Sequence, residues 1–252
     1  MDRRVGDEYV KRDYRAWHEA RDLHYFQLRL KETDLAIAVD QVSYSDHLIS
    51  LCQDEVRRLR ADLEYYISRQ PAFRTSFVPL ALLPGAPAIA RHMAQAAAQA
   101  GVGPMAAVAG AFAQAVGEKL MGQVQEIIVE NGGDIYLNSK SDRLVSVFAG
   151  RSKFSSRLGI KIKAEVSPMG ICTSSGTVGP SISLGKADAV VILAPDAALA
   201  DAVATGAANL VQNKDDLMKA IEFAQNINGI SGILAIKDDR MAAWGNVEMV
   251  GL

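Results

Sequence analysis

The chain has 252 residues, with 27 Lys and Arg against 29 Asp and Glu, and this balance argues against a nucleic-acid-binding protein because phosphate backbones are bound by clustered positive charge. Its only two cysteines, Cys52 and Cys172, exclude a disulfide scaffold or a cysteine-rich zinc site. A charged N-terminus and the lack of an apolar run of ~20 residues predict a cytoplasmic protein with no signal peptide and no membrane partner.

Charge is concentrated at the start of the sequence. Residues 1–75 hold 27 of the 56 charged residues and three of the four histidines. Because the same segment carries core-forming patterns, we expect an N-terminal layer packed on the main body of a single domain spanning 1–252. Alternating polar and apolar residues at 24–31, and an apolar run at 35–39, predict two strands joined by a tight turn.

Three helices are expected next. Ser45 is a suitable N-cap for an amphipathic helix that runs to Pro71. Segments 87–101 and 104–122 each begin with Pro and end with Gly, the usual asymmetry of helix ends. Their alanine-rich faces predict close helix packing and, with the apolar composition, a homodimer.

Beyond residue 125 the apolar period changes to that of strands. We expect short strands at 126–130, 135–137, 144–148, 158–163 and 187–194. Helices at 196–211 and 214–225 follow, and then strands at 232–236 and 246–250. Runs of strands followed by helices favour an α+β layered domain with a largely antiparallel sheet and packed helices.

A glycine turn separates two of these apolar runs. The structural interpretation is a hairpin whose glycines supply positive φ. The functional interpretation is a ligand that lies on bare glycine backbone and receives hydrogen bonds from flanking polar side chains. The candidate ligand-binding residues of this turn are Glu130, Asn131, Gly132, Gly133 and Asp134.

A second polar stretch, residues 170–179, consists mainly of glycines and small hydroxyl residues. Its backbone N–H groups and hydroxyls suit an anion-binding nest, although a plain Ser/Thr/Gly loop is a common alternative. The candidate ligand-binding residues here are Thr173, Ser174, Ser175, Gly176 and Thr177. We interpret the neighbouring Cys172 as a small core residue, not a nucleophile.

The helix expected after Pro195 carries Asp201 and Thr205 at i, i+4 spacing, so both project from one face. A carboxylate and a hydroxyl one turn apart can supply two hard oxygen ligands to Mg²⁺ or Ca²⁺. The alternative is a solvated Asp with a Thr bonded back to its own helix.

Taken in order, four strings resemble the ApbE-like superfamily, which includes the FAD:protein FMN transferases. They are Gly-Val-Gly-Pro-Met at 101–105, Glu-Asn-Gly-Gly-Asp-Ile-Tyr at 130–136, the small-residue stretch 170–179, and Leu-Ala-Asp-Ala-Val-Ala-Thr at 199–205. The chain is most similar to an uncharacterised cytoplasmic branch, which shares Lys-Glu-Thr-Asp at 31–34 and the Met-Ala-Ala-Trp-Gly pattern near the end.

The resemblance implies a T-fold-like architecture, a FAD or FMN ligand and Mg²⁺. It implies that Asp201 and Thr205 are metal ligands, with a backbone carbonyl near 103–107, and that Gly132, Gly133 and Asp134 lie against the flavin nucleotide. The transferases cleave FAD at its pyrophosphate and move FMN to a threonine, while the metal neutralises developing phosphate charge.

The sequence also departs from the transferases. Their His-x-x-Asp-Pro-x-x-Gly segment is replaced here by 178–185, which lacks that His and Asp, and the lysine of their Gly-Ile-Ala-Lys-Gly helix start is absent. We therefore hypothesise a protein that binds a flavin or other phosphate-bearing, nucleotide-like ligand, with metal-assisted transfer or hydrolysis at phosphorus. The alternative is a ligand-binding or assembly protein that kept the fold and lost the chemistry. The sequence assigns no catalytic residue.

Overall fold

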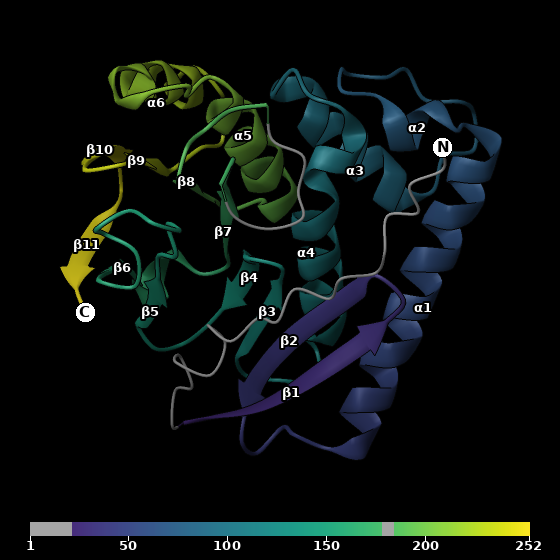
Figure 1. Cartoon of the computed structure of the whole chain (residues 1–252). Coiled ribbons are helices and arrows are strands. Elements are labelled where there is room, and N and C mark those ends of the chain that lie inside the picture. The colour runs from purple at the N-terminus through teal and green to yellow at the C-terminus, as the bar shows by residue number, and fades with distance from the viewer. Residues whose placement is uncertain (1–21, 178–183) are drawn as a thin grey trace, which may run out of the picture.

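A computed structural model describes residues 22–177 and 184–252. Within them, an antiparallel sheet of eight strands has the order β1-β2-β3-β4-β7-β8-β9-β10 (Figure 1). Its strands are β1 Leu23–Leu30, β2 Thr33–Asp40, β3 Ile127–Asn131, β4 Asp134–Asn138, β7 Met169–Ser174, β8 Ala189–Ala194, β9 Gly232–Lys237 and β10 Arg240–Gly245.

The N-terminal hairpin is part of this main sheet. Strand β1 pairs only with β2 in the described structure, while β2 pairs with β3, so that Ile37 lies opposite Val129. The described part of the charged N-terminal segment thus extends the sheet and also contributes to its helical layer. The remaining residues of that segment, 1–21, lie outside the described residues.

Helices cover one face of the sheet (Figure 1). They are α1 Asp46–Arg69, α2 Ala72–Thr75, α3 Ala88–Gln99, α4 Val108–Leu120, α5 Ala197–Asn209 and α6 Leu217–Gln225, with short 3₁₀ turns at 104–107, 164–166 and 214–216. Helix α4 packs on β3 and β4, and α5 packs on β7 and β8. Burial of apolar side chains between helices and sheet, from Leu28 to Ala235, forms the larger core.

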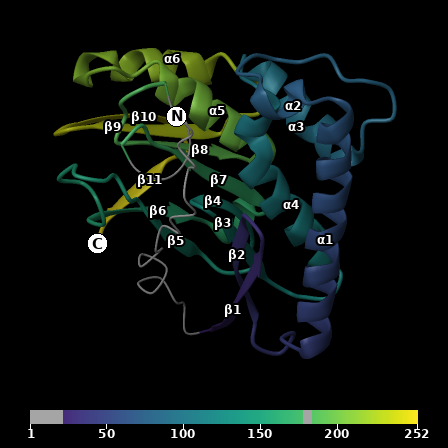
Figure 2. The ribbon, with the colours of Figure 1, turned by 45° about the vertical axis from the view of Figure 1, so that its right-hand side comes forward.

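A second, three-stranded sheet covers part of the opposite face (Figure 2). Its strands are β5 Arg143–Ser146, β6 Leu158–Ile162 and β11 Glu248–Gly251, in the order β11-β6-β5. Buried side chains of both sheets, including Ile160, Ile171 and Leu234, form a smaller core between them. Strands β4, β7, β8 and β9 are therefore covered on both faces, which explains why β8 is buried at each of its six positions.

The structure confirms the α+β prediction and most of its elements. Ser45 is the N-cap of α1, where its side chain accepts a hydrogen bond from the Leu48 N–H at 3.2 Å. Two strands were not predicted. Residues 170–174, interpreted as loop, belong to β7, and β10 was not recognised because its residues are mostly exposed. The expected C-terminal strand forms as β11, in the small sheet.

Among the described helices, none is long and apolar enough on its own to cross a membrane. Within residues 22–177 and 184–252, one pair of helices, Ala88–Gln99 and Pro104–Leu120, is long and apolar enough when its two members are taken together, but they meet at a bend of 102°.

Candidate functional site

The glycine turn joins β3 to β4 as predicted. Gly132 and Gly133 have φ values of 71° and 108°, the left-handed region in which residues with a Cβ are strained. The Glu130 carboxylate accepts a hydrogen bond from the Gly133 N–H at 2.9 Å, so this side chain folds back over its own turn. The hairpin geometry alone therefore explains why glycines occupy this turn. We call the partly exposed backbone of residues 131–133, at this end of the sheet, the ledge.

The first turn of α4 lies beside this ledge. Asn131 Nδ2 donates to the Ala109 carbonyl at 3.2 Å. The N–H of Gly110 donates to Asp201 Oδ2 at 2.9 Å, and the N–H of Ala109 also bonds to Asp201. The first N–H groups of a helix have no partner inside it and carry partial positive charge. Asp201 on α5 satisfies two of them, and it is buried rather than solvated.

Asp134 lies next to this interaction. Its side chain is buried, and its Oδ1 accepts a hydrogen bond from the Thr173 N–H of β7 at 3.1 Å. Burial raises the pKa of Asp201 well above its ordinary value, and the negative charge of Asp134 raises it further, against the lowering effect of the two N–H donors. A bound cation would favour the ionised form of Asp201, so this arrangement suits one.

Cys172 lies among the same groups. Its side chain is buried, and its Sγ donates to the Ala197 carbonyl at 3.3 Å. Burial, followed by the charges of Asp134 and Asp201, raises the pKa of the thiol well above its ordinary value. The thiol therefore stays protonated at neutral pH, and the prediction that Cys172 is a core residue is confirmed.

Glycines bring these elements close together. A Cβ on Gly110 would lie 2.1 Å from the Ala197 carbonyl oxygen and 2.9 Å from Asp201 Cβ. A Cβ on Gly170 would lie 2.5 Å from Ala197 Cα. The segment interpreted as loop is a strand because it pairs with β4 and β8, and its glycine at 170 is required where β7 passes under α5. The prediction of close helix packing is confirmed.

The start of α5 is joined to α3 by a charged pair. Asp196 is the N-cap of α5 and accepts a hydrogen bond from the Leu199 N–H at 2.9 Å. Its other oxygen lies 2.8 Å from His92 Nε2. This hydrogen bond, opposed by burial, raises the pKa of His92. The pair lies at the far end of β8 from Asp188, at the start of the helix that carries Asp201.

The remaining predicted residues lie beyond the end of β7. Ser174 is buried, and the N–H of Gly176 donates to the Ala187 carbonyl at 2.9 Å. The hydroxyls of Ser175 and Thr177 lie 3.3 Å apart. Thr177 Oγ1 donates to Asp188 at 3.2 Å, so this segment leads away from Asp201 and into a separate pocket.

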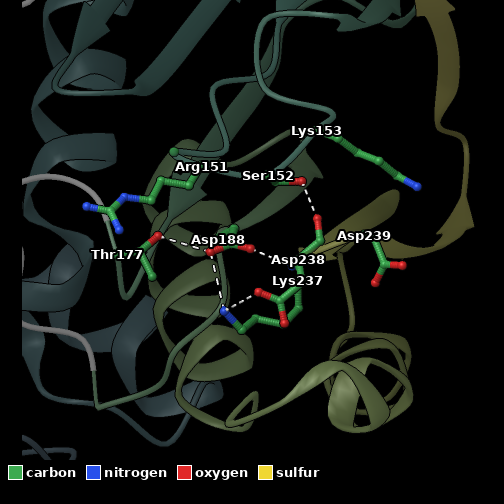
Figure 3. A pocket seen from close by; sticks show the side chains of 9 residues that line it. Arg151, Ser152, Lys153, Thr177, Asp188, Lys237, Asp238 and Asp239 are labelled. Atoms are coloured by element: carbon green, nitrogen blue, oxygen red, sulfur yellow. Dashed lines mark hydrogen bonds and ion pairs between the residues drawn. The ribbon is translucent and has the colours of Figure 1, made fainter.

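That pocket was not predicted from the sequence (Figure 3). It is a half-open pocket of about 590 Å³, formed mainly by charged and hydroxyl-bearing residues: 150–153, Thr177, Asp188 and 237–239. The available signals were two short charged stretches between apolar runs, Gly-Arg-Ser-Lys at 150–153 and Lys-Asp-Asp-Arg at 237–240. Nothing in either stretch indicated that it would meet the other.

The side chains of Asp201 and Thr205 offer oxygen atoms to a cation. Thr205 is half-buried one turn further along α5, and α5 packs against the 3₁₀ turn at 104–107, whose backbone carbonyls the resemblance implicates. No group of three or more His, Cys, Asp or Glu side chains in the described part of the chain is placed to hold a metal ion. A cation here would therefore need hydroxyl or carbonyl ligands, which are those that Mg²⁺ accepts.

The structure thus brings Asn131, Asp134, Thr173 and Asp201 together around the start of α4. Glu130 bonds within its own turn, and Thr177 lines the adjacent pocket. Residues 178–183, most of the segment that departs from the transferase pattern, lie outside the described residues.

A family model and individual relatives both match most of this chain. A family described as AbpE bacteria matches residues 15–232. A UPF0280 protein of Methanococcus maripaludis strain C7 is 40% identical over 232 residues, which cover 89% of this chain and 92% of that protein. A UPF0280 protein of Methanocaldococcus jannaschii is 39% identical over 223 residues, covering 86% and 89%.

Two solved structures with a similar fold are named as a flavin transferase and a flavinyl transferase. The flavin transferase ApbE from Vibrio cholerae has a TM-score of 0.56 at 14% identity, covering 88% of this chain and 96% of that chain. The apo form of the Pseudomonas stutzeri flavinyl transferase ApbE has a TM-score of 0.53 at 12% identity, covering 88% and 93%. At these identities the likeness concerns the fold.

Proposed function

Because this chain belongs to the family described as AbpE bacteria, we propose that it binds a flavin nucleotide, or another phosphate-bearing ligand, on the ledge formed by the β3–β4 turn. The ligand lies against Gly132 and Gly133, next to the carboxylates of Asp134 and Asp201. The proposed reaction is transfer or hydrolysis at phosphorus, assisted by Mg²⁺.

The observation that carries this proposal is the environment of Asp201. A carboxylate that is buried beside a second carboxylate is unstable as an anion, and burial is the main cause of its raised pKa. The described residues supply two backbone N–H groups to it. A divalent cation would stabilise the ionised form, and a phosphate group would complete the coordination of that cation.

The residues present fit Mg²⁺ in the chemistry of their donors. Asp201 and Thr205 would hold the ion with oxygen atoms, together with a backbone carbonyl of the 104–107 turn. When bound, the metal would supply positive charge against a phosphate group. Asn131 fixes the start of α4 through the Ala109 carbonyl, and the Thr173 N–H orients Asp134. By fixing the groups around the ledge, these contacts would keep a bound ligand in one position.

The test is a titration of the purified chain with FAD, with and without Mg²⁺, that follows flavin absorbance and the release of FMN or AMP. We expect binding that depends on the metal and is weakened by Asp201→Asn and by Thr205→Val. Asp54→Asn is a matched control, because it removes a carboxylate from the exposed face of α1. Equal FAD affinity in all four proteins, or no binding in any, would contradict the proposal.

A second candidate function is ligand binding or assembly without catalysis. It is favoured by the sequence, which has no histidine after His92 and lacks the Asp of the transferase segment at 178–185. Under this alternative FAD binds without turnover. Metal-dependent FAD binding with no FMN or AMP released at long incubation would support it over the transferase hypothesis.

The predicted homodimer belongs to the same proposal. The alanines of α3 and α4 that suggested it are mostly buried or half-buried within one chain, so an interface would have to use other surfaces. The mass of the protein in solution tests this prediction directly.

A further inference from the structure

The main sheet has two edge strands, β1 and β10, and they differ in their protection. In the described part of the chain, β1 pairs only with β2, and β10 pairs only with β9. Edge strands are usually protected from pairing with another chain by charged side chains, proline or bulges. The exposed positions of β1 include Gln27 and Arg29, whereas β10 has no proline and a single charged residue, at its first position. The outer edge of β10 therefore lacks the usual protection.

Exposed apolar side chains surround β10. A shallow groove of about 490 Å³ lies between α6 and β10, and Met218 and Met241 both line it. Strand β11 lies on the same side of the molecule as β10 (Figure 1). Four large apolar side chains of this region are 37–55% exposed: Met218, Met241, Trp244 and Met249. Exposed apolar side chains that gather in one region, rather than singly, mark an interaction surface.

The backbone of β10 determines which groups face its outer edge. A two-residue turn, 238–239, joins β9 to β10, so the flanking residues Lys237 and Arg240 form a hydrogen-bonded pair. Hydrogen-bonded and non-hydrogen-bonded pairs alternate along an antiparallel ladder. The N–H and C=O groups of Ala242 therefore bond to β9, and those of Met241 and Ala243 point away from it. These two residues are the ones that a further strand would meet.

The outward groups suit a second copy of the same strand. A two-fold axis perpendicular to the sheet, at Ala242, pairs β10 antiparallel with its copy, and Met241 of each copy then lies opposite Ala243 of the other. Each of these two pairs exchanges two N–H···O=C bonds, so four bonds form from the groups that point outward. A register with the axis at Ala243 would instead require the Gly245 carbonyl, which already accepts a hydrogen bond from the Val247 N–H at 2.9 Å.

The side chains of β10 are also self-complementary in this register. Arg240 of one copy lies opposite Trp244 of the other, and both project from the same face of the sheet. A guanidinium beside an indole ring is a favourable cation–π pair. The two copies of Arg240 lie ~14 Å apart along the strands, beyond the ~8 Å over which exposed charges interact at physiological salt. The pairing therefore brings no like charges of β10 together, and it places small alanines at the axis.

We propose that β10 is the edge at which two copies of this chain pair, so that the main sheet continues from one copy into the other. This inference rests on the homodimer that belongs to the proposed function, and it names the surface. The occupant is a second copy because β10 fits itself both in hydrogen bonding and in charge. Met218 of α6 and Met249 of β11 flank the strand pair and add apolar contact on the two faces of the sheet.

The first test is the mass of the protein in solution over a range of concentrations, measured by analytical ultracentrifugation. Ala243→Lys places two lysines in diagonal positions ~7–8 Å apart, where they repel each other. The matched control is Val42→Lys, which introduces the same charge at a side chain that is 89% exposed after β2. We expect the unaltered chain to have twice its mass of 27.1 kDa. Ala243→Lys raises the dimer dissociation constant at least tenfold, and Val42→Lys changes it less than twofold.

Cysteine cross-linking tests the register. In the proposed pair, Ala242 lies opposite its copy with ~4.5 Å between the Cα atoms, which is within the range of a disulfide. Ala243 lies ~7–8 Å from its copy, beyond that range. With oxidised glutathione as oxidant, we expect Ala242→Cys to form a covalent dimer at least ten times faster than Ala243→Cys. Cys52 and Cys172 are buried and do not contribute.

The outcomes separate this inference from the proposed ligand site. A dimer that is lost in Ala243→Lys, in a protein that binds no FAD, supports the inference and contradicts the flavin assignment. A monomeric unaltered chain overturns the inference, and FAD binding that requires Asp201 would still leave the ligand site standing.

Three further results would overturn the inference. A dimer that Ala243→Lys and Val42→Lys weaken equally, or leave intact, uses another surface. Cross-linking that is faster in Ala243→Cys than in Ala242→Cys contradicts the register. Slow hydrogen exchange of the β10 amides in a monomer, measured by mass spectrometry, would mean that another segment of the same chain covers this edge.

Discussion

Replacement of Asp201 by Asn and by Ala separates its structural role from its proposed ligand role. Asn keeps an oxygen that can accept the Gly110 N–H, which bonds to Asp201 at 2.9 Å, but removes the charge. Ala removes both. We therefore expect Asp201→Asn to be at least as stable as the unaltered chain without metal at neutral pH, and Asp201→Ala to be clearly less stable.

The size of the difference follows from the hydrogen bonds. Asp201→Ala leaves the buried N–H groups of Ala109 and Gly110 without their acceptor, and each unsatisfied buried donor costs about 1–3 kcal/mol. The two variants should thus differ by at least about 2 kcal/mol, which corresponds to roughly 4–8 °C in melting temperature for a chain of this size.

The raised pKa of Asp201 determines how the free energy of unfolding changes with pH. Because the pKa of Asp201 is raised in the folded state, the folded protein binds more protons than the unfolded chain at pH values between the unfolded and folded pKa values. The free energy of unfolding therefore falls as the pH rises through that window, and the loss is complete above the folded pKa. Asp201→Asn lacks this contribution, so its stability relative to the unaltered chain increases with pH.

Thermal melting of the three proteins from pH 4 to pH 8, with and without Mg²⁺, measures these effects. A metal present at 100 times its dissociation constant would add about 2.7 kcal/mol to the unaltered chain, and neither variant should gain as much. The reasoning is refuted if Asp201→Asn and Asp201→Ala melt together, or if the stability difference between Asp201→Asn and the unaltered chain is the same at every pH.

Three further predictions concern the scaffold. The raised pKa of His92 stabilises the folded protein, fully below pH ~6.5, and this contribution is lost as the pH rises through the raised pKa. His92→Gln should lack it, so the free energy of unfolding in urea should differ less between pH 6 and pH 9 in the variant than in the unaltered chain. Gly110→Ala should separate α4 from α5 and cost about 1–3 kcal/mol, whereas Gly122→Ala, where a Cβ meets nothing within 4 Å, should melt normally. Ser45→Ala should cost about 1 kcal/mol through loss of the N-cap of α1, measured by denaturant unfolding.

Each of these predictions has an outcome that contradicts it. Unchanged pH dependence in His92→Gln would mean that the pair with Asp196 contributes nothing in solution. Normal melting of Gly110→Ala would mean that the two helices can separate at no cost. For Ser45→Ala, the control is Ser50→Ala, whose hydroxyl bonds to the Asp46 carbonyl on the exposed face, and equal stability of the two variants would remove the capping explanation.

Local sequence determined most of the elements, because helix periods, caps and turn glycines act within a few residues. The Ser45 cap, the Gly132 and Gly133 turn and the helix that carries Asp201 follow from short-range patterns. Strand β7 was missed for a physical reason. Its small residues match those of a loop. They form a strand because β7 pairs with β4 and β8, and residue 170 is a glycine because Ala197 leaves no room for a Cβ.

In the candidate site too, local sequence determined some features and tertiary structure determined others. The order of the motifs identified the superfamily and the candidate residues Asp134 and Asp201 from sequence alone. Only the tertiary structure places both carboxylates around the first turn of α4, since the 66 residues between them carry no local signal of that contact. The pocket of Arg151, Asp188 and Lys237 could not be predicted at all, because it forms where two sheets meet, and charged residues on separate turns give no indication of their partners until the chain is folded.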